Sequence, residues 1–262
     1  MQELNHLDLA FVVDTTGSMG AFIQTAQRQM IALLKGLSTS ADTPIDLRLA
    51  VVEYRDHPPQ DHSFVARAYD FSGDLGKVQK TINGLKPDGG GDTPEAVYDG
   101  LSAACEELAW RGHSQRLAVL IGDAPPHGYP RGGDGFPNGC PCGQTQDSIT
   151  ALLEEKGITL YALGLTGMVN DSFGRLARYT GGEYFEARHA DDALKALQAL
   201  LTREFGDVDF DRQVLEHCRG NTAWTVDSLG AALVSPRPRL SASLSRLGRR
   251  GLLSSLAVAG IK

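Results

Sequence analysis

Short apolar runs alternate with stretches of helical periodicity along most of this chain. The run at residues 7–13, LDLAFVV, is almost wholly apolar, which is typical of a parallel strand buried on both faces. A polar turn follows, and then apolar residues recur at helical spacing up to about Gly36. This order repeats: strands are expected at 7–13, 45–54, 63–68, 116–121, 158–163 and 183–186, and helices at 22–36, 74–85, 94–109, 145–156, 171–179 and 191–203.

Strands and helices that alternate at this spacing indicate βαβ units with right-handed crossovers. We therefore predict an α/β fold, with a Rossmann-like, open, mostly parallel central sheet of about six strands and helices on both faces. Ligands of such sheets bind outside the carboxyl ends of the strands, so functional side chains are expected in the loops at that edge.

The charge of the chain changes near residue 206. Residues 1–206 carry 27 acidic and 17 basic side chains, whereas residues 207–262 carry five and eight. We predict one domain over 1–206 and a mainly helical, basic C-terminal appendage over 207–262, with helices at 212–218, 227–234 and 240–256. Its Arg- and Leu-rich end could pack on its own domain or act as a second docking surface for a partner or an anionic membrane, and we favour packing or docking on protein.

The overall composition excludes several classes of function. A net charge of −7 argues against nucleic acid as the main ligand, because phosphate binding needs clustered Lys and Arg. The apolar stretch at 251–261 is too short to span a bilayer, and membrane association is not expected. The first residues do not have the pattern of a targeting segment, and four cysteines are too few for a disulfide scaffold. We expect a cytoplasmic protein.

Three polar loops fall at the predicted binding edge of the sheet. The first, DTTGS at 14–18, follows the first strand, and the second, GGGDT at 89–93, precedes the helix at 94–109. The third, GD at 122–123, follows the strand at 116–121. One such loop is a weak signal, but three in the right order are a strong one. Together they offer five carboxylate and hydroxyl side chains: Asp14, Thr16, Ser18, Thr93 and Asp123.

Oxygen ligands without His or Cys favour Mg²⁺ or Mn²⁺, with Ca²⁺ possible, over Zn²⁺. Because three of the five groups are neutral hydroxyls, much of the charge of the ion stays uncompensated. Such a site favours an acidic ligand, most simply an Asp or Glu carboxylate of a partner protein. In the alternative interpretation, Asp14 and Ser18 are helix N-caps and Asp123 forms a turn.

The three loops resemble a known family. DTTGS is similar to the DxSxS-type motif of von Willebrand factor A domains, in a variant with Thr in the middle, and GGGDTPE and IGD are similar to the second and third loops of that family. The resemblance covers roughly residues 7–203. It implies the von Willebrand A fold and a metal-ion-dependent adhesion site whose ligands, directly or through water, are Asp14, Thr16, Ser18, Thr93 and Asp123.

Two further segments look closer to one subgroup of the family, found in bacterial stand-alone proteins and beside α-kinases. They are YRD at 54–56 and DAPPHG at 123–128. The resemblance implies a non-enzymatic, metal-dependent protein-binding module that acts as an adaptor in a bacterial multi-protein assembly with an ATPase, kinase or protease.

Two other functions remain open at this point. A metal-dependent hydrolase could use a Mg²⁺-bound water with His127 as general base, although no catalytic motif accompanies that residue. A structural scaffold could keep the sheet and leave the metal unused. The long third loop also places His127, Cys140 and Cys142 within one segment, but three ligands and a CxC spacing are a weak zinc signal. We favour a loop that flanks the metal site and shapes what can approach it.

Overall fold

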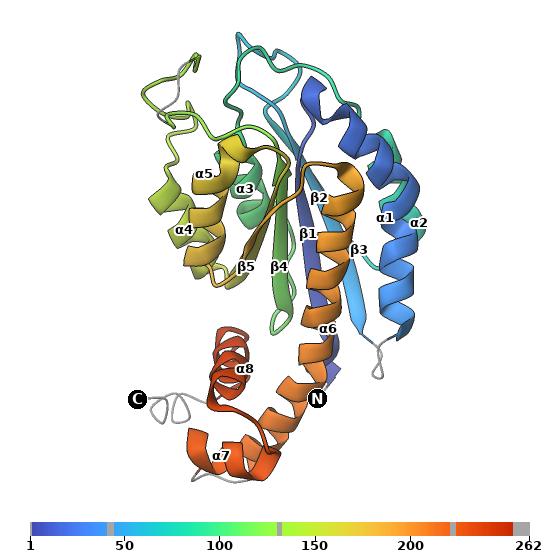
Figure 1. Cartoon of the computed structure of the whole chain (residues 1–262), viewed down its shortest axis with the longest axis vertical. Helices are drawn as coiled ribbons and strands as arrows, with labels where there is room; N and C mark the ends of the chain where they lie inside the picture. The colour runs from blue at the N-terminus through green and yellow to red at the C-terminus, as the bar shows by residue number, and fades with distance from the viewer. Residues whose placement is uncertain (1, 41–44, 130–132, 221–223, 254–262) are drawn as a thin grey trace.

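A computed structural model describes residues 2–40, 45–129, 133–220 and 224–253. Its centre is a six-stranded sheet in the order β3-β2-β1-β4-β5-β6, in which β3 is antiparallel to β2 and the other pairs are parallel (Figure 1). The predicted fold class is therefore confirmed. The strands are β1 (His6–Asp14), β2 (Asp46–Tyr54), β3 (Ala66–Ser72), β4 (Gln115–Gly122), β5 (Ile158–Gly164) and β6 (Tyr184–Glu186).

Helices cover both faces of the sheet (Figure 1). One face packs against α1 (Gly20–Ser40), α2 (Leu75–Gly84) and α6 (Ala190–Gly220), and the other against α3 (Val97–Glu106), α4 (Gln146–Glu155) and α5 (Asn170–Tyr179). Short 3₁₀ turns lie at Gln2–Asn5, Gly17–Met19 and Gly167–Val169.

The alternation of side chains along β1 explains the two layers. Leu9 and Phe11 point into the core beneath α1, α2 and α6, whereas Ala10 and Val12 point into the core beneath α3, α4 and α5. All four side chains are buried. Full burial of a Leu or Phe side chain contributes about 1.5–3 kcal/mol, so a strand with apolar residues at every position is stable only in the middle of such a sandwich.

The structure corrects several predicted boundaries. The third strand lies at Ala66–Ser72 rather than at 63–68. The helices expected at 191–203 and 212–218 are one helix, α6, because Phe205 and Val208 continue its buried face and the exposed Gly206 does not interrupt it. The last helix, expected at 240–256, is α8 (Arg237–Arg249); Pro238 stands in its first turn, and Gly251, with φ +66°, follows its end. Residues 254–256 lie outside the described part.

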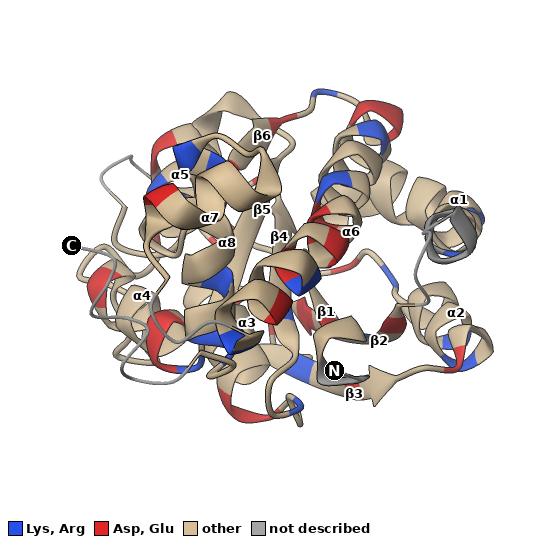
Figure 2. Cartoon of the chain, turned by 90° about the horizontal axis from the view of Figure 1, so that it is seen from below, with Lys and Arg blue, Asp and Glu red and all other residues tan. Residues whose placement is uncertain are grey.

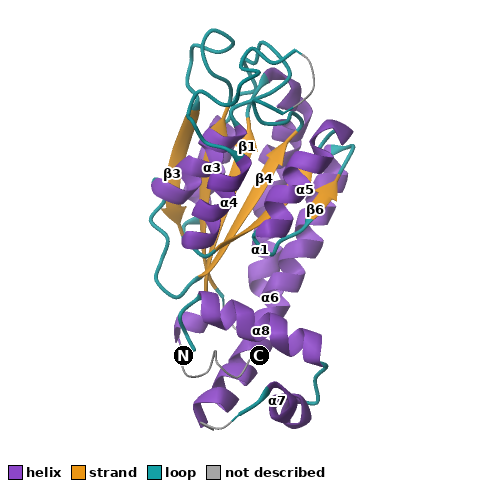
Figure 3. Ribbon diagram, turned by 90° about the vertical axis from the view of Figure 1, so that its left-hand side faces the viewer, coloured by secondary structure: helices purple, strands orange, loops and turns teal. Residues whose placement is uncertain are grey.

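The C-terminal helices pack below the sheet, at the end opposite the three polar loops (Figure 3). Helices α7 (Val226–Leu233) and α8 share a small apolar core with the lower half of α6, which includes Val214, Leu229 and Leu244. Arg246 of α8 forms ion pairs with Asp207 and Asp211 of α6, and acidic and basic positions of these helices lie side by side in the view from below (Figure 2). Of the two alternatives considered for the Arg- and Leu-rich end, the structure thus shows residues 237–249 packed on the chain itself.

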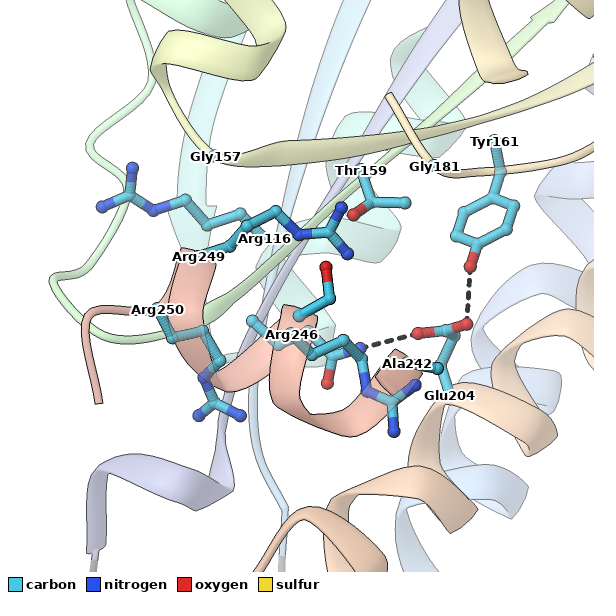
Figure 4. Close-up of a pocket in the computed structure, with 12 residues that line it drawn as sticks. Arg116, Gly157, Thr159, Tyr161, Gly181, Glu204, Ala242, Arg246, Arg249 and Arg250 are labelled. Atoms are coloured by element: carbon cyan, nitrogen blue, oxygen red, sulfur yellow. Dashed lines mark hydrogen bonds between the residues drawn. The ribbon is translucent and has the colours of Figure 1, made fainter. Parts of the chain in front are cut away.

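A polar cavity of about 240 Å³ lies between the lower end of the sheet and α8 (Figure 4). Glu204 of α6 lies in it and accepts hydrogen bonds from Gln115 of β4 and Tyr161 of β5. Arg116 and Arg246 also line it, from β4 and α8. In the described part of the chain, no helix is both long enough and apolar enough to cross a membrane.

Candidate metal centre

The register of the central strands brings the polar loops together. Val13 of β1 pairs with Ile121 of β4, so Asp14 at the end of β1 and Asp123 just after β4 emerge side by side. The second loop reaches the same place, because the backbone N–H of Gly17 donates to the carbonyl of Gly89 at 3.2 Å. The predicted convergence of the three loops therefore occurs, at the upper edge of the sheet in Figure 3.

Asp14 forms the floor of the site. It is fully buried, and its Oδ1 accepts hydrogen bonds from the backbone N–H of Thr16 at 2.8 Å and from the Thr16 hydroxyl at 2.6 Å. The hydroxyls of Thr16 and Ser18 are 3.3 Å apart, and Ser18 is also within hydrogen-bonding reach of Asp123. Four of the five predicted side chains thus lie together, with Ser18 on the exposed rim.

Thr93 is placed differently from the other four. It lies exposed on the loop before α3, and among the described residues its side chain makes no hydrogen bond to the first loop. The side chain that faces Asp14 from the second loop is Glu95, which is 3% exposed.

Gly90 allows Glu95 to approach the first loop. Its φ is +78°, a conformation that favours glycine. A Cβ at this position would lie 3.0 Å from Oε1 of Glu95 and 3.2 Å from Cβ of Thr16. The glycine-rich sequence of the second loop therefore lets its backbone fit between two ligand-bearing segments.

Burial, together with neighbouring acidic groups, raises the pKa of carboxyl groups at this site. Burial is the main cause at Asp14, whose pKa rises to about 7 despite the hydrogen bonds from Thr16, and Asp123 adds a like charge. Burial also dominates at Glu95, where the charges of Asp14, Asp56, Asp92 and Asp123 contribute to a pKa of about 10. A group of acidic side chains this close is costly to ionise without a compensating cation.

The site also contains buried carboxylate oxygens without partners. Asp14 Oδ2 and Glu95 Oε2 make no hydrogen bond to any described residue, and neither do Asp56 Oδ2 and Asp92 Oδ1. Buried polar atoms are nearly always paired, so these orphaned oxygens indicate a missing positive group. Hard oxygen donors are the ligands of Mg²⁺, Mn²⁺ and Ca²⁺, and the residues present therefore fit a divalent cation.

His127 is held between two carboxylates beside this centre. Its Nε2 lies 2.7 Å from Asp56 Oδ1 and its Nδ1 lies 3.0 Å from Asp134 Oδ1, with the side chain fully buried. Burial opposes its ionisation, but Asp56 and Asp134 outweigh burial and raise its pKa above 6.5. Both ring nitrogens of His127 are thus engaged by carboxylates, and its side chain is buried. His127 is therefore poorly suited to act as a general base.

The sequence model of one protein family, the von Willebrand factor type A domain, matches residues 8–200 of this chain. The chain belongs to this family. Among curated proteins, this von Willebrand A domain is 27% identical over 175 residues to the alpha-protein kinase vwkA of Dictyostelium discoideum, covering 64% of this chain and 27% of that protein. It is 30% identical over 130 residues to a putative ariadne-like RING finger protein of Acanthamoeba polyphaga mimivirus, covering 50% of this chain and 12% of that protein. The chain thus spans only a small part of these relatives.

Solved structures show the same fold at low sequence identity. The proximal thread matrix protein 1 of the mussel byssus, in a structure with a zinc-occupied metal-ion-dependent adhesion site, matches with a TM-score of 0.55 and 19% identity over 76% of this chain and 46% of its own. BatB of Bacteroides thetaiotaomicron matches with a TM-score of 0.51 and 14% identity over 76% of this chain and 98% of its own.

Several residues around the metal centre of this von Willebrand A domain were not predicted from the sequence. Glu95 and Asp92 had no signal beyond their place in GGGDTPE, and Asp56 was visible only as part of YRD. The suggested grouping of His127 with Cys140 and Cys142 is wrong. His127 binds Asp56 and Asp134, whereas the thiols lie beside His57 and Asp99.

Proposed function

We propose that this von Willebrand A domain is a non-enzymatic protein-binding module in which a divalent cation bridges to an acidic side chain of a partner. Asp14, Thr16, Ser18, Thr93 and Asp123 would hold the ion, directly or through water. The observation that carries the proposal is the orphaned Oδ2 of Asp14 on a buried floor, beneath a rim on which Ser18 and Thr93 are exposed. A cation bound there would be reachable from solvent on one side.

The donor set favours Mg²⁺ or Mn²⁺, with Ca²⁺ as a further candidate. When bound, the ion supplies an electrophilic coordination position that a partner carboxylate can fill. The chain itself contributes the rigid floor, since Asp14 is fixed by both the hydroxyl and the backbone N–H of Thr16. The zinc-occupied site of the mussel protein supports the view that this fold can hold a divalent ion at the corresponding loops.

We further propose that the module is an adaptor in a bacterial multi-protein assembly and works in the cytoplasm. The named kinase and RING finger relatives support an adaptor role, because in both the matching region is a small part of a longer protein. The engagement of both ring nitrogens of His127 by Asp56 and Asp134 argues against the hydrolase alternative.

The proposal is tested by capture of partners on the immobilised chain from an extract of the source cells. We expect a protein that is retained in Mg²⁺, is released by a chelator and is not retained by Asp14→Ala. Asp88→Ala is the matched control, since Asp88 is an exposed acidic residue on the same rim. A partner that binds Asp14→Ala in chelator as well as it binds the unmodified chain would leave a metal-independent scaffold instead.

A further inference from the structure

A second cluster of metal-binding side chains lies beside the first, on different elements. His57 follows β2, Asp99 lies in α3, and Cys140 and Cys142 belong to the long loop between β4 and α4. The Nε2 of His57 is 3.0 Å from Oδ2 of Asp99 and 3.3 Å from Sγ of Cys140. The Sγ of Cys140 is 2.9 Å from Oδ2 of Asp99 and 2.9 Å from Sγ of Cys142.

The donor atoms of His57, Asp99 and Cys140 all lie within 4.8 Å of one another, and Cys142 extends this group through its contact with Cys140. One imidazole nitrogen, one carboxylate oxygen and two sulfur atoms can surround a single ion, and zinc in structural sites binds four ligands of these types tetrahedrally. Both cysteines are free thiols. The contacts within the group join atoms that can each bind a metal, and metal binding would displace the thiol protons.

The burial of these side chains is that of a site that is already formed before a metal ion binds and that an ion can enter from solvent. His57 and Cys140 are buried, and only Cys142 is exposed. The ring of Phe136 packs edge-on against His57, with centroids 5.8 Å apart, and against His127, with centroids 4.9 Å apart. The imidazole of His57 is thus held in place by Phe136 of the β4–α4 loop and by Asp99 of α3.

A cross-link at this position would help to order the β4–α4 loop. It runs from Asp123 to Gln144 without a regular helix or strand among its described residues, and ordering a loop of that length costs conformational entropy. His127 anchors the first part of the loop to Asp56 and Asp134. The cysteines lie at the far end of the loop, where a bound ion would anchor it to α3 through Asp99.

We propose that His57 Nε2, Asp99 Oδ2 and the Sγ atoms of Cys140 and Cys142 bind one zinc ion that fixes the β4–α4 loop beside the adhesion site. The two metal centres then differ in chemistry. Thiolates and imidazole select zinc, whereas the carboxylates and hydroxyls around Asp14 select harder cations. The zinc site stands independently of the proposed partner-binding function.

The first test measures the zinc content of the full chain. The protein is produced in zinc-containing medium, purified under reducing conditions and desalted into a buffer that contains Mg²⁺, so that the oxygen site is filled by the harder ion. We expect about one zinc ion per chain, reduced to near zero by Cys142→Ser and by Asp99→Asn. Cys218→Ser is the matched control, because Cys218 lies in α6 among the C-terminal helices, and it should retain zinc. Asp14→Ala should retain zinc as well. Retention of zinc by Cys142→Ser, or its loss from Asp14→Ala, overturns the proposal.

The second test uses Co²⁺ in place of zinc and does not depend on the folding of a variant. Cobalt bound by thiolates in a tetrahedral site gives a sulfur-to-metal charge-transfer band and strong visible bands, which an all-oxygen site cannot give. We expect these bands in the unmodified chain and in Asp14→Ala. Their absence from the folded, reduced chain overturns the assignment, as does a thiol count showing that Cys140 and Cys142 are oxidised to a disulfide in protein purified without reductant.

Discussion

At the scale of single residues, the candidate metal centre combines groups that the sequence reveals to different degrees. Asp14 and Thr16 were predictable because their spacing is local: two residues of one turn can face the same point whatever the rest of the fold does. Glu95 was not predictable, since an acidic residue near the start of a helix normally signals only a favourable interaction with the helix dipole. Only the tertiary approach of the second loop to Asp14 turns Glu95 toward the metal centre.

Glu95→Gln tests the role of that carboxyl group. The substitution keeps the size and polarity of the side chain but removes a carboxyl group that could ionise when a cation binds. We expect Mg²⁺ or Mn²⁺ to bind about 10-fold more weakly, as is typical when an outer carboxylate of a metal site is lost. Calorimetric titration of the chelator-treated variant measures this. Unchanged affinity would show that Glu95 is a structural residue with no part in metal binding.

Asp8 is expected to make the free energy of unfolding depend on pH in the acid range. It is buried at the lower end of β1 and accepts hydrogen bonds from Arg48, Arg111 and Ser114. Burial alone would raise its pKa, but the two arginines lower it below 3.8. The stabilisation is therefore complete well above pH 3.8 and is lost as the pH falls from there through the lowered folded-state pKa.

Asp8→Asn should remove this contribution. We expect a loss of about 2 kcal/mol from the free energy of unfolding at neutral pH, measured by urea titration, because a hydrogen-bonded charge is replaced by a neutral amide. In acid the variant and the unmodified chain should converge. If their difference stayed constant down to low pH, protonation of Asp8 would not be the cause.

At the scale of elements, the central strands and most helices followed from periodicity, and the exceptions have local causes. Strands such as β4 and β5 are buried on both faces, so their uninterrupted apolar runs mark them clearly. The segment between the two helices expected at 191–203 and 212–218 contains Gly206 and several aspartates, which in isolation indicate a break. Packing of Phe205 and Val208 against the rest of the molecule outweighs that local preference.

Gly206→Ala tests whether α6 is one continuous helix. Gly206 is exposed inside the helix, and a Cβ there would meet no atom within 4 Å. We expect the free energy of unfolding to rise by about 0.5–1 kcal/mol, because alanine loses less backbone entropy in a helix. Gly182→Ala is the contrasting variant and should destabilise the protein, since its Cβ would lie 2.0 Å from the carbonyl oxygen of Leu160. Destabilisation by Gly206→Ala would mean that α6 is not continuous in solution.

At the scale of the whole molecule, the candidate metal centre and the C-terminal helices lie at opposite ends of the sheet. The three loops gather at the carboxyl ends of the strands, and the C-terminal helices close the other end (Figure 3). Sequence alone predicted the upper end well, because the order of βα units fixes which loops meet. It predicted helices after residue 206 but not how they dock, since their contacts with α6 and the sheet depend on side chains far apart in the chain. The division into domains at 206 stays a prediction, and α6 passes through that position without a break.

Arg246 tests how strongly the C-terminal helices are attached. It pairs with Asp211, which is fully buried, at 2.6 Å and with Asp207 at 3.0 Å. Arg246→Ala leaves the carboxylate of Asp211 buried without its partner, so we expect a loss of about 3 kcal/mol in the free energy of unfolding. Arg237→Ala is the control, because its pair with Asp227 is exposed and should contribute little. Equal effects of the two substitutions would contradict the docking of α8 described above.

The central claim is that the three loops form one divalent cation site, and titration calorimetry of Mg²⁺ and Mn²⁺ into chelator-treated protein tests it most directly. We predict a single binding event that Asp14→Ala abolishes and Asp88→Ala preserves, with the fold of both variants intact by circular dichroism. Binding of equal strength in Asp14→Ala, or no binding of either ion to the unmodified chain, would contradict the account.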